Sequence, residues 1–420
     1  MSGLNFEQAP APSHPLRFLL SALAWGAIAG IWVAWSGPGI LVSRWAPATI
    51  VLVHLLTLGV LGNAMVGSLI QFLPVAAGSP LPGSRYAPVV HLALNCGIAC
   101  LLPAIGFHAS VLAGVAVFLL AGTLAAFAVA ALIGLLRGSG RTPPRMGIGM
   151  ALAAILANVV LGIAMLGIRV GWWGSPAHSL VDLHAALGIV GWVIGLIGAV
   201  GGITLPMLQG TRAIPRPAAI VWLTVLALTL LTAIGSSIGL FPDGARTVLA
   251  LPVALLSGAV LFLQWKSPHR RNPTLRRFWA VGSACLLAAV SVAVASPGPW
   301  PFDRPILVGA LLLGAGLPFL VLGMTLEIMG FLTWIEMRRR VPRGTRIPGV
   351  GSLLPEPGKK RLLVSHCLAA TTLIVSVAYP PLARIAGLFV ALAYVATFRS
   401  AWSCWRDGIA FAASHRPAST

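Results

Sequence analysis

The chain has 420 residues, of which 58% are hydrophobic and only 9% are charged. No hydrophilic stretch approaches the length of a soluble domain, so the composition excludes a soluble protein and predicts an all-α polytopic membrane protein. The net charge of +20 calls for no nucleic-acid partner, because anionic lipid headgroups attract basic loops beside a membrane. The lipid bilayer is therefore the first expected partner.

Twelve apolar stretches follow one another along the chain, and each can cross a bilayer. A hydrocarbon core of ~30 Å needs about 20 helical residues. We predict one transmembrane domain over residues 18–406, between an N-terminal segment 1–17 and a tail 407–420. The predicted spans are Phe18–Trp35, Ala48–Ala76, Pro88–Phe107, Ala109–Leu136, Met146–Val170, His178–Leu208, Pro217–Leu240, Ala245–Trp265, Leu275–Ala295, Pro305–Met337, Arg361–Tyr379 and Leu382–Trp402.

The basic residues predict how the spans are oriented. With the N-terminus in the cytoplasm, 23 of the 28 Lys and Arg residues fall in cytoplasmic segments. Because positive charge is retained on the cytoplasmic side, we expect both termini and the basic loop 338–360 to face the cytoplasm of a bacterial inner membrane. The segment Met1–Pro15 lacks the basic start of a secretory signal, so the first helix is predicted to be retained.

Two histidines are predicted to lie at the same depth in the membrane. Spans two and six both descend from the outer face, and His54 and His184 each lie about six residues in. At 1.5 Å rise per residue, both side chains are expected ~9 Å below the outer boundary. They can therefore share one site.

The sequence around this pair repeats. His54 is followed by Gly59 and Gly62, and four spans later His184 is followed by Gly188 and Gly191. The offset between the two histidines, applied once more, reaches Gly314 in span ten, where glycines occur without a histidine. This pattern predicts a pseudo-threefold repeat of four-helix units in which two units carry an imidazole.

An imidazole inside a bilayer needs partners for its nitrogens, and it is also the usual protein ligand of haem iron and copper. Three interpretations of His54 and His184 follow: a cofactor or metal site, a substrate or proton pathway, and structural hydrogen bonding. The small-residue faces of the two helices predict close helix packing, and they could equally accept a porphyrin plane. These glycines are Gly59, Gly62, Gly67, Gly188, Gly191, Gly195, Gly198, Gly201 and Gly202.

Other intramembrane polar residues form a second set of candidates. His91 and His366 open spans three and eleven, near the cytoplasmic face, and Gln71 lies near the end of span two. Glu327 in span ten is predicted close to the membrane centre, where a carboxyl is protonated, paired or turned to a wet cavity. These four residues are candidates for a proton pathway or a secondary site.

The arrangement resembles the heme-copper oxidase subunit I superfamily, and most closely its small NnrS-like and oxidase-like offshoots. The likeness rests on twelve spans, the histidines of spans two and six, the four-helix period and the run from Gly323 to Trp334 around Glu327. It implies that His54 is an axial ligand of haem b and that His184 binds copper. Spans seven and ten lack the further histidines that this family uses, so oxygen reduction by its mechanism is not expected.

Three functions remain open from the sequence. The first is a haem- or copper-binding membrane protein in respiratory or nitric-oxide-stress metabolism, with an electron-transfer or respiratory partner. The second is a proton-coupled permease that uses Glu327 and the intramembrane histidines. The third is a structural subunit of a respiratory complex. No P-loop, GxSxG or HExxH motif indicates soluble catalytic chemistry, and the sequence does not establish an enzyme.

Overall fold

The computed structural model describes residues 10–79, 81–140, 142–174, 178–295, 300, 302–342 and 344–415. The chain is 85% helical, and the described residues contain no strand. Twelve helical spans among them are long and apolar enough to cross a membrane, which confirms the predicted all-α polytopic fold.

Several spans combine α-helical and π-helical segments. Span two is α2 (Pro47–His54), a π-helix (Leu55–Gly62) and α3 (Asn63–Ala76), and span four is α5 (Ser110–Ala116), a π-helical turn (Val117–Ala121) and α6 (Gly122–Arg137). Span six is α8 (His178–Ala185), a π-helix (Ala186–Ile194), α9 (Gly195–Thr204) and a π-helical turn (Leu205–Gln209), and span ten is α13 (Arg304–Gly309), a π-helix (Ala310–Gly316) and α14 (Leu317–Arg340).

Each of the other spans has one main helix. In chain order these are α1 (Ser13–Ser36), α4 (Ala87–Phe107), α7 (Thr142–Arg169), α10 (Arg216–Ser237), α11 (Ala250–Trp265) at the end of span eight, α12 (Pro273–Val294), α16 (Glu356–Ala378) and α17 (Ala383–Ser414).

The helices run beyond the predicted limits at the charged ends. α17 continues to Ser414, past the predicted end at Trp402, so the first part of the predicted tail 407–420 is helical. The basic loop 338–360 contains the end of α14, the short helix α15 (Val350–Leu353) and the first turn of α16. Polar residues continue these helices because a backbone already hydrogen-bonded in a helix extends easily beyond the apolar part. Residues 1–9 and 416–420 and Arg343 lie outside the described residues.

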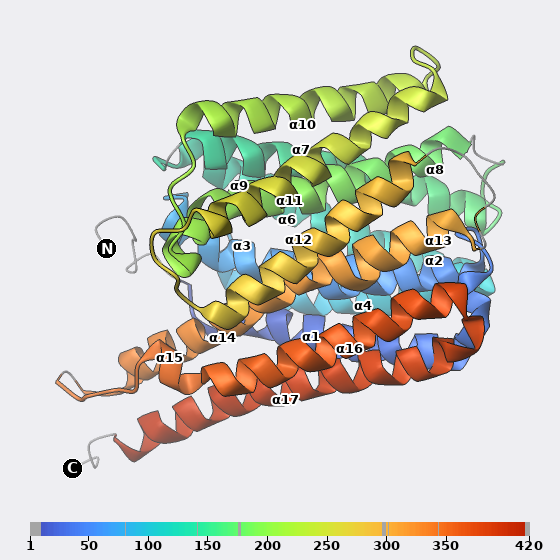
Figure 1. The fold of residues 1–420 in the computed structure, drawn as a ribbon. Coiled ribbons are helices and arrows are strands. Elements are labelled where there is room, and N and C mark those ends of the chain that lie inside the picture. Colours follow the sequence, from blue (N-terminus) through green and yellow to red (C-terminus); the bar gives the residue numbers. More distant parts are fainter. Residues whose placement is uncertain are drawn as a thin grey trace.

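The spans lie side by side as one bundle, with α1 beginning and α17 ending at the same end, near α15 (Figure 1). Neighbouring spans pack together along the chain, and span twelve packs on span one, which closes the ring. The positive charges predict that this end of the bundle faces the cytoplasm, and this orientation stays a prediction.

The predicted threefold repeat has direct structural support. Spans two, six and ten are the most buried, at 67%, 67% and 61% against 33–44% for the others, and each contains a π-helix. Two series of glycines recur at nearly constant offsets in these spans and face the first span of each unit. The first series is Gly59 against Trp25, Gly188 against Asn158 and Gly316 against Leu286; the second is Gly67 against Phe18, Gly195 against Ala151 and Gly323 against Phe278.

This contact pattern corrects the predicted register of the third unit. His54 and His184 precede the first-series glycines of their own units, Gly59 and Gly188. Counting back from Gly316 in the same way reaches Leu311 and Leu312, and not Gly314. The third unit therefore has leucine where the first two have imidazole.

Candidate cofactor site between spans two and six

The structure brings His54 and His184 together. His54 is the last residue of α2, directly before the π-helix of span two, and His184 lies two residues before the π-helix of span six. Their ring centres are 6.3 Å apart and their planes are inclined by 25°. π-helical segments are often found at functional sites, because the extra residue per turn reorients the side chains beside it.

The hydrogen bonding of His54 leaves one ring nitrogen for a ligand. Nδ1 donates to the carbonyl oxygen of Ile50 one turn earlier, at 2.8 Å. A neutral imidazole that donates through Nδ1 has a bare lone pair on Nε2. Metal-bound histidines have this arrangement, with the second nitrogen donating to a carbonyl or carboxylate.

His184 has an incomplete set of partners. Its Nδ1 is buried and forms no hydrogen bond with any described residue. Asn158 on α7 lies beside the ring: its backbone carbonyl faces His184, and its side-chain Oδ1 is also buried without a partner among the described residues. A Cβ placed on Gly162, one turn further along α7, would lie 3.4 Å from Cε1 of His184, so the glycine leaves room beside the ring. A small movement of the ring would therefore let Nδ1 donate to Asn158.

The separation of the two ring centres matches that of two imidazoles bound to one metal atom, once each ring points a nitrogen at the metal. Two metal–nitrogen bonds of ~2.0 Å, with each ring centre ~1.2 Å behind its nitrogen, place the ring centres about 6.4 Å apart. The observed separation is 6.3 Å. No cluster of three or more His, Cys, Asp or Glu side chains among the described residues could hold a metal ion. A four-ligand zinc site therefore does not fit, whereas a copper ion held by the two imidazoles would.

The glycine faces around the pair mostly serve helix packing. A Cβ at Gly59 would meet Trp25 at 2.8 Å, and a Cβ at Gly191 would meet Ala154 at 2.7 Å. A Cβ at Gly198 would lie 2.3 Å from the Trp222 ring. These faces are therefore covered by neighbouring spans, and they do not offer the flat porphyrin surface that the sequence suggested as an alternative. A single ion fits between the imidazoles with less rearrangement than a porphyrin.

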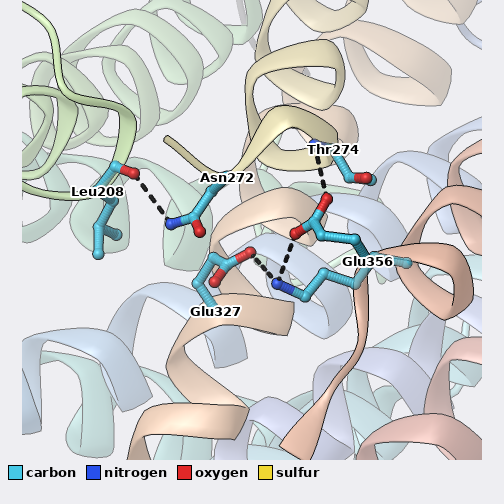
Figure 2. A network of polar contacts seen from close by, with 6 residues as sticks. Leu208, Asn272, Thr274, Glu327 and Glu356 are labelled. Carbon is cyan, nitrogen blue, oxygen red and sulfur yellow. Dashed lines mark hydrogen bonds and ion pairs between the residues drawn. The ribbon is translucent and has the colours of Figure 1, made fainter. Parts of the chain in front are cut away.

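Glu327 belongs to a separate network of charged groups at one end of the bundle (Figure 2). Its Oε1 accepts a hydrogen bond from Lys359 Nζ at 2.6 Å, and the same Nζ contacts Glu356 Oε1 at 3.1 Å. Because Lys359 lies in the first turn of α16, Glu327 is level with the end of span eleven and not with the middle of the bundle. The depth of Glu327 in a membrane stays a prediction, and its carboxylate is paired, which is one of the states expected for it.

One ammonium group serves two carboxylates in this network, and helix N-termini stabilise the second carboxylate. Glu356 begins α16, and its Oε2 accepts the backbone N–H of Thr274 in the first turn of α12, at 3.1 Å. Two helix N-termini therefore stabilise the Glu356 carboxylate, which leaves Lys359 to neutralise Glu327. Nearby, Asn272 Nδ2 donates to the carbonyl of Leu208 at 2.9 Å and ties α12 to the end of span six (Figure 2).

The remaining predicted residues do not join the histidine pair. His91 Nε2 bonds the hydroxyl of Ser21 at 2.8 Å, and its ring lies edge-on to Phe18. Gln71 is buried, and neither polar atom of its side chain has a hydrogen-bond partner among the described residues. His366 bonds Thr397 between spans eleven and twelve.

Sequence reasoning missed the amide network that supports the π-helix of span two. Asn63 Nδ2 donates to the carbonyl of Gly59 at 3.0 Å, and Asn63 Oδ1 accepts from Asn95 at 3.1 Å. Asn95 Oδ1 in turn accepts from Trp25 Nε1 at 2.6 Å. A polar asparagine in an apolar span was the available signal.

The fold and the site define an all-α multi-pass membrane protein with a repeated four-helix unit and a facing pair of imidazoles. Neither the protein-family models nor the curated protein sequences compared with this chain give a match.

Proposed function

We propose that this protein holds a metal centre between His54 and His184, in the first place a copper ion, in a scaffold related to the heme-copper oxidases; a haem iron there would require the neighbouring spans to move apart. The observation that supports this proposal is the facing imidazole pair at 6.3 Å, with the Nδ1 of His54 bonded to a carbonyl and Nε2 left as a lone pair. His54 and His184 would hold the metal, and copper or haem iron bound there would supply one-electron redox chemistry, which suits electron transfer or cofactor handling.

Reduction of oxygen is not part of the proposal. It would need more haem and copper ligands than the described residues bring together, since no three of their metal-binding side chains cluster. The positions in span ten that correspond to the two histidines are leucines. We place the protein in a bacterial inner membrane with cytoplasmic termini, where a respiratory or nitric-oxide-stress partner would exchange electrons with it.

The permease alternative depends on Glu327, and the structure favours it less. The carboxylate lies against Lys359 and is held there by a hydrogen bond of 2.6 Å. A residue that carries protons must lose and regain its charge, and the loss of charge would break this pair and leave the buried Lys359 ammonium with Glu356 alone. Glu327 therefore fits a structural role better than a proton-carrying one.

The test is metal analysis and an absorption spectrum of the protein purified in detergent, after expression with haem and copper supplied. We expect about one metal centre per chain, lost in His54→Ala and in His184→Ala. His415→Ala is the matched control, because His415 lies at the exposed end of α17 and should leave the metal content unchanged. A colourless and metal-free wild-type protein would overturn the proposal, as would full metal content in both pair variants.

A further inference from the structure

A small cavity lies between spans ten, eleven and twelve, away from the histidine pair. Its volume is about 20 Å³. Its walls come from all three spans: Gly314 and Pro318 of span ten, His366 and Ala370 of span eleven, and Val390 and Tyr394 of span twelve. This volume is enough for one water molecule and for little else.

The first polar wall of the cavity is His366, whose protonation is fixed by Thr397. The hydroxyl of Thr397 donates its single proton to the carbonyl of Ala393, at 2.9 Å. The same oxygen must therefore accept at its contact of 2.9 Å with His366 Nε2, so Nε2 carries the proton. The Nδ1 of a neutral His366 is then a bare acceptor.

The second polar wall is Tyr394, whose hydroxyl lacks a partner. The residue is only 4% exposed, and none of the described residues forms a hydrogen bond with its oxygen. Two contacts fix the Tyr394 ring in place. It packs on Gly26 of α1, where a Cβ would lie only 2.1 Å from the ring. It also stands edge-on to the His366 ring, with 5.0 Å between the ring centres. The position of the hydroxyl oxygen is therefore set by the packing of the ring.

We propose that the cavity is a binding site for one water molecule that joins Tyr394 to His366. The water accepts the proton of the Tyr394 hydroxyl and donates to Nδ1 of His366, so that both unsatisfied groups gain a partner. The resulting chain runs from Tyr394 through the water, His366 and Thr397 to the carbonyl of Ala393. It fastens span eleven to span twelve beside the buried span ten. The proposal does not depend on a metal between His54 and His184.

Thermal unfolding of the detergent-purified full chain tests the site. If the water is bound, Tyr394→Phe removes one of its partners, and we expect the Tm to fall by about 2 °C. If the hydroxyl is without any partner, the same change removes an unsatisfied buried group and leaves the Tm equal or higher. Tyr379→Phe is the matched control, because Tyr379 is exposed and should show no change.

A double-mutant cycle and a map complete the test. In a His366→Leu background the water has already lost its acceptor, so Tyr394→Phe should no longer lower the Tm and leaves it equal or higher. Equal effects of Tyr394→Phe in the two backgrounds would overturn the proposal. If His366→Leu does not fold, a cryo-EM map that resolves ordered water decides the question: a peak within hydrogen-bond distance of both Tyr394 Oη and His366 Nδ1 supports it, and its absence refutes it.

Discussion

The histidine pair and the Glu327 cluster are both polar groups buried in an apolar bundle, and they differ in how completely their atoms are paired. In the cluster, Lys359 contacts two carboxylates, and the second carboxylate also accepts a backbone N–H. At the pair, His184 Nδ1 has no partner among the described residues, and Nε2 of His54 keeps its lone pair.

This difference separates a structural role from a binding role. A buried polar group without a partner costs free energy, so it persists only where something else offsets that cost. The Glu327 cluster offsets it internally through its own ion pairs and helix N-termini. The histidine pair has no such internal compensation, and under the proposed function a bound metal would supply it.

The largest effect is expected in the cluster. Lys359→Ala would leave the Glu327 carboxylate buried and unpaired, which should lower the free energy of unfolding by about 3–5 kcal/mol. Lys360→Ala is the control, because the neighbouring Lys360 is exposed and should change stability little. Denaturant unfolding in detergent measures both. The double variant Lys359→Met with Glu327→Gln should recover much of the loss, and a single variant as stable as the control would contradict the structural role.

The next effect is stabilisation by metal. A ligand that binds only the folded protein stabilises it by about 2.7 kcal/mol at a concentration 100 times its Kd. We expect copper or haem to raise the Tm of the wild-type protein but not that of His184→Ala. An equal rise in both proteins would show that the added cofactor binds elsewhere.

A smaller effect is expected at Asn158, the neighbour of His184. If its side chain accepts from His184 Nδ1 once the metal is bound, Asn158→Ala should weaken metal binding by about 10- to 100-fold without abolishing it. Titration of the apo protein, followed by absorbance, measures the Kd. Asn272→Ala provides the comparison, because Asn272 contacts Leu208 at the other end of span six from His184. Wild-type affinity in Asn158→Ala would mean that the backbone carbonyl serves His184 instead.

The smallest effect concerns Gln71, whose side-chain amide has no partner among the described residues and does not line the cavity beside Tyr394. Gln71→Leu should leave the free energy of unfolding unchanged or raise it by about 1 kcal/mol, because it removes unsatisfied polar atoms. A clear loss of stability would instead give Gln71 a bound partner, as the predicted proton pathway requires.

The sequence was sufficient to predict the twelve spans and the meeting of His54 with His184. Both depend on hydropathy and on counting helical residues from a membrane boundary, and the two histidines lie near the start of their spans, where counting errors are small. Counting residues did not place the third unit correctly. His54 directly precedes its π-helix, whereas one residue separates His184 from its own. The sequence offset from His54 to His184 is therefore slightly longer than the offset from Gly59 to Gly188, the packing glycines that follow them. In the third unit, the positions equivalent to the two histidines are therefore Leu311 and Leu312, and not Gly314.

The partner of Glu327 could not be predicted for a different reason. Lys359 follows it across a loop whose path depends on how α15 and the start of α16 pack. The rotation of each helix about its own axis, which decides what Asn158, Thr397 and Tyr394 face, is likewise set by tertiary packing and not by local sequence.

The contact between the first and the last helix has a consequence for how the protein is made. Backbone meets backbone there: a Cβ at Gly30 would lie 2.3 Å from the nitrogen of Ala391, and one at Gly387 would lie 2.2 Å from that of Ala34. During translation α1 emerges long before α17, the helix on which it packs. The nascent bundle therefore stays open along this face of α1 until α17 has been inserted.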